Sequence, residues 1–402
     1  MKVLQVNTVT GYGSTGRTCV ELSDGLIANG HEAFIAYSQG SSAFPNSFRF
    51  GNTVEQKAHA LLSRITGLQG YYSPVGTREL VNWINCEKPD IVHLHNLHSN
   101  NINLIQLLDY LADSNTAVVI TLHDCWFFTG KCTHYTNDNC IKWETHCHKC
   151  PRLRKDNKSL FFDRTPKMFE EKKRAFGKLN NLAIIGVSDW INNEAKRSFL
   201  KNAKILETIY NWIDQSVFRP TNGNLRKKYG IPEEKSIVLG VSAGWSNKGK
   251  KLKDFTKLAG LMPENVKVVL VGGKSKLDCI PDNIIHIPYI NSATEMAEVY
   301  SLADVYVHLS TEDTFGKVIA EAMACGTPVV VYNSTACPEV VGRGCGIIVD
   351  RRDIVGITRA AVKIITDGKS VYSGNCIKHV TENFNYNQQV RKTVRVYERI
   401  LQ

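Results

Sequence analysis

Two carboxylates eight residues apart are the side chains best placed to do chemistry in this sequence. Asp313 follows the apolar segment 305–310, and Glu321 lies in the segment 317–324, where apolar residues recur at helical spacing. A strand that leads through a loop into a helix would carry both acids on one turn. Because carboxylates accept hydrogen bonds from hydroxyl groups, the pair suits a sugar-binding site.

Main-chain groups beside these acids suit an anion. Thr314, Phe315 and Gly316 precede the predicted helix, which Lys317 opens. Unpaired N–H groups and the helix dipole favour negative charge at a helix N-terminus, so a diphosphate fits there. The alternative is an ordinary loop acid followed by a helix acid that faces solvent. If both features are functional, they predict a site for a sugar nucleotide.

A glycine-rich loop follows the first predicted strand. Gly11, Gly13 and Gly16 have the spacing G-x-G-x-x-G between that strand and a helix, as in dinucleotide-binding loops. Such loops need an acid about 20 residues further on to bind the ribose, and residues 37–39 are Tyr, Ser and Gln. A nicotinamide enzyme is therefore an alternative without its specificity residue.

Histidines end two predicted strands in the first half of the chain. His123 and Asp124 follow segment 117–121, and His93 and His95 alternate along the preceding strand, with His98 beyond it. Since open α/β sheets bind ligands at the carboxyl ends of strands, His123 is expected in a site, where Asp124 would orient its ring or act as a base. His93 and His95 share one face, which allows metal binding but favours burial or contact with an acceptor.

Four cysteines lie in a polar stretch with little apolar material of its own. They are Cys132, Cys140, Cys147 and Cys150, spaced C-x7-C-x6-C-x2-C. Four thiolates can close a tetrahedral zinc site, which would stabilise such a loop and leave no open position for catalysis. The alternatives are four free cysteines or a redox pair formed by Cys147 and Cys150.

Short apolar strands alternate with amphipathic helices twice along the chain, which predicts two doubly wound α/β domains. A segment at 211–224 that is rich in Pro, Gly and Asn marks the hinge. The predicted strands are 2–7, 33–37, 91–94, 117–121 and 183–187, then 236–241, 267–271, 284–287, 305–309 and 328–332.

Composition is that of a globular protein of 402 residues with 12 cysteines and no apolar run of 18 residues. The first residues, MKVLQV, turn polar too soon for a signal peptide, so the cytoplasm and a reducing environment are expected. The net charge is +11, and residues 131–204 hold 17 Lys and Arg against 8 Asp and Glu. This basic stretch suits anionic lipid, a pyrophosphate-linked acceptor or nucleic acid, or is simply a solvated face.

Together these motifs resemble the glycosyl transferases group 1, the retaining GT-B glycosyltransferases of family 4. Segment 313–321 is similar to the family pattern of two Glu separated by seven residues, with Asp313 in place of the first Glu. The glycine loop, HLHNLH, TLHDCW, VSDWI, YNWID and WSNKGKK occur in the family's order, with a likeness to its bacterial capsule, exopolysaccharide and lipopolysaccharide subgroup.

The resemblance implies an α/β GT-B fold, in which two Rossmann-like doubly wound domains face a central cleft. Residues 1–212 would bind the acceptor and residues 213–385 the nucleotide-sugar donor, with a C-terminal helix at 386–402 packed on the first domain. The donor would be a UDP-, GDP- or ADP-sugar, and the acceptor a saccharide or an undecaprenyl-pyrophosphate-type lipid-linked saccharide. The implied reaction retains the anomeric configuration and needs no catalytic metal, and no nucleic-acid partner is expected.

Roles of single residues also follow from the resemblance. Glu321 would bind the ribose, Asp313 the sugar hydroxyls and Lys248 the diphosphate, while His123 would contact the sugar and the acceptor. The positions of the loop that approaches the donor phosphates are Gly13, Gly16 and Arg17, and Gly244 and Gly272 would line the nucleotide pocket. The family's Arg six residues before the Lys is Ser242 here. Two alternatives stand beside this prediction, a GT-B sugar-nucleotide epimerase and a zinc-containing nucleic-acid-binding protein.

Overall fold

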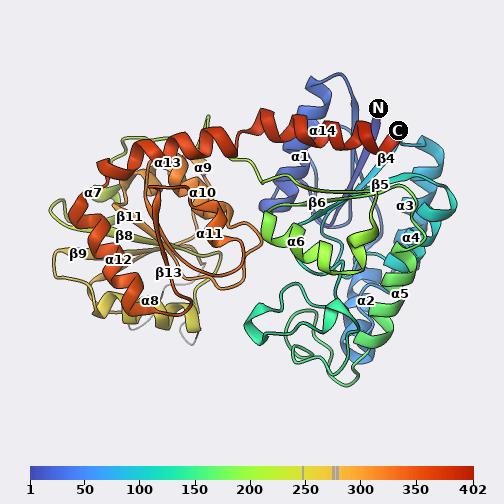
Figure 1. The fold of residues 1–402 in the computed structure, drawn as a ribbon, viewed down its shortest axis with the longest axis horizontal. Helices are drawn as coiled ribbons and strands as arrows, with labels where there is room; N and C mark the ends of the chain where they lie inside the picture. The colour runs from blue at the N-terminus through green and yellow to red at the C-terminus, as the bar shows by residue number, and fades with distance from the viewer. Residues whose placement is uncertain (247–248, 274–276, 278–279) are drawn as a thin grey trace. The chain divides into compact units, whose positions relative to one another are not determined.

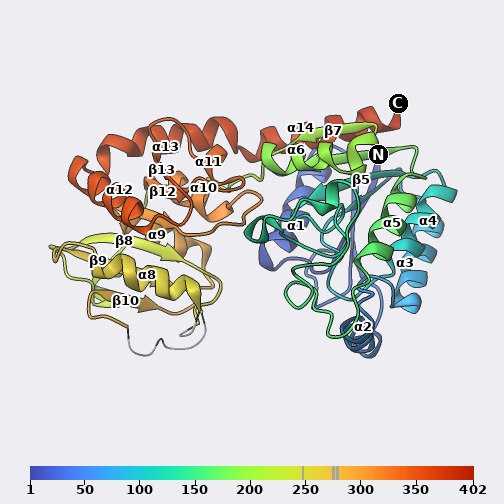
Figure 2. The same ribbon diagram turned by 60° about the horizontal axis from the view of Figure 1, so that its bottom comes forward.

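The chain folds into two compact units, each built around a parallel sheet. The computed structural model describes residues 1–246, 249–273, 277 and 280–402. Unit 1 consists of Met1–Ile209 and Asn387–Gln402, and unit 2 of Tyr210–Tyr386. Figures 1 and 2 show a core of strands with helices around it in both units. Within the described ranges, no helix is long and apolar enough to cross a bilayer.

Unit 1 has a seven-stranded parallel sheet in the order β3-β2-β1-β4-β5-β6-β7. Its strands are β1 Lys2–Asn7, β2 Glu32–Tyr37, β3 Ser47–Arg49, β4 Ile91–Leu94, β5 Ala117–Leu122, β6 Leu182–Gly186 and β7 Ile205–Thr208. Its helices are α1 Gly13–Ala28, α2 Thr53–Thr66, α3 Pro74–Glu87, α4 Leu104–Asp113, α5 Thr165–Phe176, α6 Asp189–Arg197 and most of α14 Tyr386–Leu401. Helices α3, α4 and α5 form a row on the face of the sheet opposite α1 (Figure 2).

Unit 2 has a six-stranded parallel sheet in the order β10-β9-β8-β11-β12-β13. Its strands are β8 Ser236–Val241, β9 Val266–Val271, β10 Ile284–Ile287, β11 Val305–His308, β12 Val329–Tyr332 and β13 Gly346–Val349. Its helices are α7 Leu225–Tyr229, α8 Lys250–Gly260, α9 Ala293–Leu302, α10 Lys317–Ala324, α11 Cys337–Val340, α12 Ile354–Asp367 and α13 Ser370–Asn383.

The central strands are apolar because helices cover both faces of each sheet. Every residue of β4, β5, β6, β11 and β12 is buried, as is usual for parallel sheets. Polar side chains inside such strands must find hydrogen-bond partners, because a buried unpaired group costs free energy. In β1 and β4 these exceptions are Gln5, Asn7 and His93.

The last helix, α14, is attached to unit 1 through one of these polar side chains. Tyr397 is fully buried, and its hydroxyl lies 2.6 Å from Nδ1 of His93. The other ring nitrogen of His93 lies 2.8 Å from Oγ1 of Thr121 on β5. Burial lowers the pKa of His93 to about 3, so its ring is neutral. The helix therefore closes a hydrogen-bonded chain that crosses the centre of the sheet.

Replacing Tyr397 by Phe is expected to destabilise unit 1 by about 1–3 kcal/mol, because Nδ1 of His93 is then buried without its partner. The free energy of opening is measured from hydrogen exchange of the slowest amides in β4 and β5, which reports on unit 1 alone. Tyr110→Phe, at a half-exposed position of α4, is the matched control. Equal exchange in the two variants would contradict the expectation.

Candidate functional site

In unit 2, Asp313 is held by a chain of hydrogen bonds from β11. The carboxylate oxygen Oδ2 lies 2.7 Å from Nε2 of His308, and Nδ1 of the same ring lies 2.9 Å from the hydroxyl of Tyr306. Because an ionised carboxylate only accepts, Nε2 of His308 donates to Asp313, and in the neutral ring Nδ1 then accepts from the hydroxyl of Tyr306. The main-chain N–H of Asp313 donates to Oγ1 of Thr335 at 3.0 Å. Neither His308 on β11 nor Thr335 in the loop after β12 was assigned a role from the sequence, and the two fix this acid from different segments.

Glu321 lies on α10, which begins directly after the loop that carries Asp313. Its Oε2 accepts a hydrogen bond from the hydroxyl of Tyr300 at 3.1 Å. Burial, followed by the charge of Glu321, keeps the pKa of Tyr300 far above its usual range, so this hydroxyl stays a donor. After burial, the charges of Asp313 and Glu321 raise the pKa of Tyr306. Both acids thus lie around the same pair of buried tyrosines.

The ligand atoms of His308, Asp313 and Cys337 lie within 4.8 Å of one another, and no other group of three His, Cys, Asp or Glu in the described ranges does so. Two ligands of one tetrahedral ion at about 2.0–2.1 Å would be about 3.3 Å apart. The 2.7 Å between His308 and Asp313 is shorter and has the length of a hydrogen bond. We therefore interpret the trio as a hydrogen-bonded support for Asp313.

The loop between the two acids turns sharply at Gly316, whose φ is +84°. A Cβ there would lie 2.7 Å from the side chain of Ile319, so only glycine fits. The Phe315 side chain is buried against Phe384, with ring centroids 5.1 Å apart. Of the predicted donor-binding loop, Phe315 accordingly offers a ligand its main chain only, whereas Thr314 and Lys317 are partly exposed.

Glycines follow the neighbouring strands β8 and β9 at the same edge of the sheet, Gly272 directly after β9 and Gly244 three residues after β8. A Cβ on Gly272 would lie 1.8 Å from the carbonyl oxygen of Ser242, so the two strand ends approach as closely as main chains can. Gly244 is exposed and open to solvent. Lys248 lies outside the described residues. Lys251, three positions beyond it, donates from Nζ to Oγ of Ser242 at 3.2 Å, which brings a cation to the end of β8.

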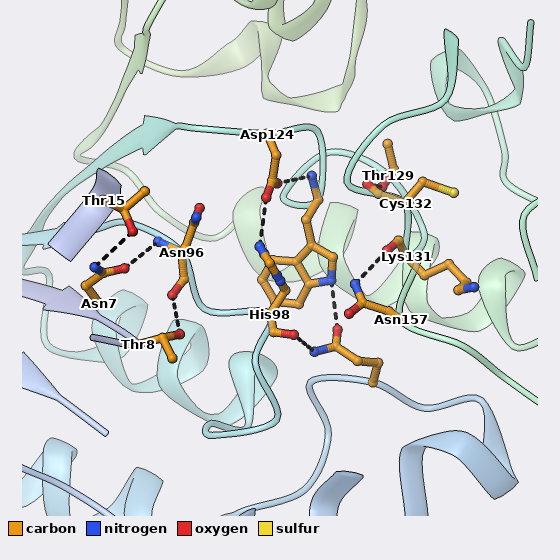
Figure 3. Close-up of polar contacts among 12 residues, drawn as sticks. Asn7, Thr8, Thr15, Asn96, His98, Asp124, Thr129, Lys131, Cys132 and Asn157 are labelled. Carbon is orange, nitrogen blue, oxygen red and sulfur yellow. Dashed lines mark hydrogen bonds and ion pairs between the residues drawn. The ribbon is translucent and has the colours of Figure 1, made fainter. Parts of the chain in front are cut away.

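In unit 1, the glycine loop is fixed to the loop after β4 by Asn7, a residue that the sequence did not single out. Nδ2 of Asn7 donates to the carbonyl of Val9 at 2.8 Å. Oδ1 of Asn7 accepts from N–H of Asn96 at 3.1 Å (Figure 3). Gly13 has φ +65° and is exposed. Gly16 is buried against Val9, and a Cβ on Gly16 would lie 3.1 Å from the side chain of Val9. Arg17 is exposed and has no ion-pair partner within the described ranges.

His123 is oriented by His95, which directly follows β4. Its Nε2 lies 3.1 Å from Nδ1 of His95, whose Nε2 lies 3.0 Å from Oε1 of Gln5. The Gln5 amide nitrogen donates to Cys19 and Ser23. His95 must therefore donate from Nε2 to Gln5, and burial keeps its pKa well below the usual value. Being neutral, it accepts at Nδ1, which places a proton on Nε2 of His123.

Asp124 does not orient His123 as one of our two hypotheses held. Its Oδ2 forms an ion pair with Nε2 of His98 at 2.8 Å, and its Oδ1 accepts from N–H of Trp126 at 2.8 Å (Figure 3). Burial alone would raise the pKa of Asp124, but the charge of His98 and these contacts lower it. Such a carboxylate is a weak proton acceptor near neutral pH, so Asp124 is suited to anchoring the loop rather than to acting as a base.

The ion pair of His98 and Asp124 predicts a pH dependence. Burial acts to lower the pKa of His98, but Asp124 outweighs it and the net shift is upward from 6.5. The pair should stabilise the fold fully below pH 6.5 and lose this effect as pH rises through the raised pKa. On the acid side, the pair loses its stabilising effect only below pH 3.8, as pH falls through the lowered pKa of Asp124.

The pKa of His98 is measured by NMR titration. We expect a value above 6.5, and Asp124→Asn should bring it below 6.5, because burial then acts without a compensating charge. An unchanged pKa in the variant would show that the carboxylate does not control this ring.

Known proteins resemble both units. Residues 15–217 match Glycosyltransferase Family 4, and residues 222–376 match Glycosyl transferases group 1. The putative colanic acid biosynthesis glycosyl transferase WcaC of Escherichia coli K12 is 21% identical over 377 residues, which are 89% of this chain and 90% of that protein. The N-acetyl-alpha-D-glucosaminyl L-malate synthase of Bacillus anthracis is 29% identical over 202 residues, 48% of this chain and 52% of that enzyme.

Solved structures share the fold over almost the whole chain. Sucrose-phosphate synthase from Thermosynechococcus elongatus has a TM-score of 0.72 at 16% identity and covers 99% of this chain and 98% of its own. HepE of Anabaena in complex with UDP-glucose has a TM-score of 0.62 at 17% identity, with 98% and 99% covered. These likenesses confirm the predicted α/β GT-B fold class. With a match that spans more than half of its residues, the chain belongs to Glycosyltransferase Family 4.

Proposed function

We propose that this protein moves a sugar from a nucleotide-diphosphate sugar to a saccharide or lipid-linked saccharide acceptor, with retention of configuration, in the synthesis of a bacterial surface polysaccharide. The observation that carries the proposal is the pair Asp313 and Glu321, held at the carboxyl edge of β11 beside the glycine-ended strands β8 and β9. The family match supports the transferase over a nucleic-acid-binding protein. HepE binds UDP and UDP-glucose, which supports a nucleotide-sugar donor.

Unit 2 would bind the donor. In this proposal Glu321 accepts hydrogen bonds from the ribose, and Asp313 accepts them from sugar hydroxyls. The bond between the anomeric carbon and the diphosphate oxygen breaks, and charge grows on the leaving diphosphate. Lys248 and Lys251, with main-chain N–H groups at residues 314–316, would stabilise that charge, and no metal ion is then required.

Unit 1 would bind the acceptor. Arg17, which forms no ion pair within the described part of the chain, and the open main chain around Gly13 suit phosphate. His123, with a proton on Nε2 that His95 binds, would contact the sugar and the acceptor through the rest of its ring. The acceptor oxygen forms the new glycosidic bond, and its proton leaves with the diphosphate or to solvent. A curated relative from Campylobacter jejuni, 25% identical over 170 residues, is named for transfer to a diphospho-undecaprenol-linked sugar, which supports a lipid-linked acceptor.

The activity is tested with UDP-, GDP- and ADP-sugars, each with and without a pyrophosphate-linked saccharide. Product that forms only with acceptor, and whose anomeric configuration by NMR equals that of the donor, is the expected result. Inverted product would contradict retention, and donor epimerised without any acceptor would favour the epimerase.

A patch of exposed apolar side chains flanked by cations on unit 1 supports a location of the protein at the inner face of the cytoplasmic membrane. Leu160 donates its N–H to the carbonyl of Arg64 at 2.8 Å, so segment 158–164 lies against the end of α2. The patch consists of the exposed side chains Leu61, Leu62, Ile65, Leu160, Phe161 and Phe162, flanked by exposed Lys57, Arg64, Lys158 and Arg164. Apolar side chains among cations match an interface of anionic lipid. A lipid-linked acceptor would be met there.

Glu321→Gln should raise the dissociation constant of the nucleotide-sugar donor about 10- to 100-fold, because charged hydrogen bonds to the ribose are lost. Glu382→Gln, at an exposed position of α13, is the matched control. Donor affinity is measured by calorimetry, and equal affinities in both variants would remove Glu321 from the site.

The double variant Phe161→Ser and Phe162→Ser should weaken binding to anionic vesicles by about tenfold or more, since two half-exposed rings no longer enter the interface. Val371→Ser, which is exposed on unit 2, is the control. Binding is measured by co-sedimentation with vesicles of phosphatidylglycerol, and donor affinity should stay unchanged in both proteins. Equal sedimentation would contradict the membrane contact.

A further inference from the structure

We propose that Cys132, Cys140, Cys147 and Cys150 bind one zinc ion, whose negative tetrathiolate shell is balanced by two buried lysines, and that this centre fixes the loop that carries Asp124. All four cysteines line one small cavity of about 20 Å³ in unit 1. That is room for a single small occupant. The proposal does not depend on the sugar-transfer activity.

The geometry of the cavity suits thiolate ligands. Sγ of Cys132 lies 3.9 Å from Sγ of Cys150, close to the distance of about 3.8 Å that two sulfur ligands at 2.3 Å from a tetrahedral zinc ion would have. Sγ of Cys147 accepts a hydrogen bond from N–H of Gly130 at 3.3 Å. No three of the sulfur atoms lie within 4.8 Å of one another, so zinc binding would draw the side chains of Cys140 and Cys147 inward.

Segment 125–164 needs such a centre more than the rest of the unit does. Its regular structure is limited to two short 3-10 helices, Thr136–Asp138 and Lys142–Glu144. Tyr135 and Trp143 line the cavity, and their buried hydroxyl and Nε1 groups have no hydrogen-bond partner within the described ranges. Thiolates are acceptors and would lie beside these donors. Zinc binding would supply folding free energy to a loop with few hydrogen-bonded elements.

Charge is the strongest argument. Zinc with four thiolates has a net charge of −2, which is costly in a buried place unless cations lie near. Lys131 and Lys172 are both 1% exposed, and neither forms an ion pair with a carboxylate within the described ranges. Nζ of Lys131 donates to the carbonyls of Arg152 and Leu153, and Nζ of Lys172 to those of Trp126 and Thr129.

Both amino groups interact electrostatically with the cysteines. Lys131 interacts with Cys150 and Cys132 before Asp156 and Asp163, and Lys172 with Cys147, Asp124 and Cys132. Carbonyl groups satisfy the N–H donors of a lysine but cannot neutralise its charge. The two buried amino groups therefore lie where their charge would offset the negative charge of the proposed centre, together with that of the carboxylates that act on them. Binding would release the protons of the four thiols to solvent.

The centre is connected to the site through Trp126. The carbonyl of Trp126 accepts from Lys172 at 2.6 Å, and its N–H donates to Asp124. Lys172 also lies 3.9 Å from the centroid of the Trp126 ring. Figure 3 shows Cys132 and Lys131 on the loop that continues from Asp124. Loss of zinc would free Lys172 of its charge partner and loosen this attachment.

The first test is the metal content of the full chain, purified without chelator and measured by inductively coupled plasma mass spectrometry. We expect about one zinc per chain. Cys132→Ser and Cys150→Ser should each lose most of it, and Cys86→Ser, at an exposed position of α3, should retain it. A wild-type chain without zinc, with iron alone, or with a disulfide between Cys132 and Cys150 by non-reducing peptide mapping would overturn the proposal, whether or not the variants fold.

A second test separates the metal centre from simple packing. Lys172→Met replaces a buried cation by an apolar side chain of similar length and should speed zinc release to a chromogenic chelator about tenfold or more. The neighbouring Lys173→Met, which is exposed, should leave release unchanged. Equal release rates would overturn the charge balance. His148 also lines the cavity, and zinc lost in His148→Ala would overturn the four-cysteine ligand set.

Discussion

Parallel pairing of strands is the constraint on which the candidate sites depend. It directs the carboxyl ends of β1, β4 and β5 to one edge of the first sheet, and those of β8, β9, β11 and β12 to one edge of the second. The glycine loop, His95 and His123 follow the first set. Ser242, Gly272, Asp313 and Thr335 follow the second. Segments far apart in the chain therefore meet without any contact that is specific to the ligand.

The same constraint makes the supporting residues polar and buried. A parallel sheet covered on both faces leaves no water for a polar side chain, so each one needs a partner in the protein. Gln5 and His95 satisfy each other and thereby decide which nitrogen of His123 carries a proton. Tyr306 and His308 likewise satisfy each other and thereby orient the carboxylate of Asp313. Residues that hold the fold together at these points also set the chemistry at its edge.

The sequence predicted four strands well because each is a short, mostly apolar run bounded by polar or turn residues. Segments 2–7, 91–94, 236–241 and 284–287 agree with β1, β4, β8 and β10 to the residue. It missed β3, β7 and β13, whose edge positions leave their residues partly exposed and their pattern weak. It placed Asp313 and Glu321 on the correct strand, loop and helix. The partners of Asp124 and Asp313 could not be predicted, because His98 and Thr335 reach them through loop geometry. Two features of the sequence could have indicated buried polar partners: a lone Gln in the first strand, which contacts His95, and a His five residues before Asp313.

Buried charge shows why such partners matter. The ion pair of His98 and Asp124 keeps a carboxylate ionised in an apolar surrounding. Lys131 of the same loop and Lys172 of α5 are buried, and both donate to neutral carbonyls. A fold that buried these cations for stability alone would gain more from apolar side chains of the same volume. Their place beside four cysteines gives them a purpose, since a negative metal centre and positive lysines cost less buried together than either does alone. The loop that begins at His123 would then owe its shape to electrostatics as well as to its buried aromatic side chains, among them Trp126, Phe128 and Trp143.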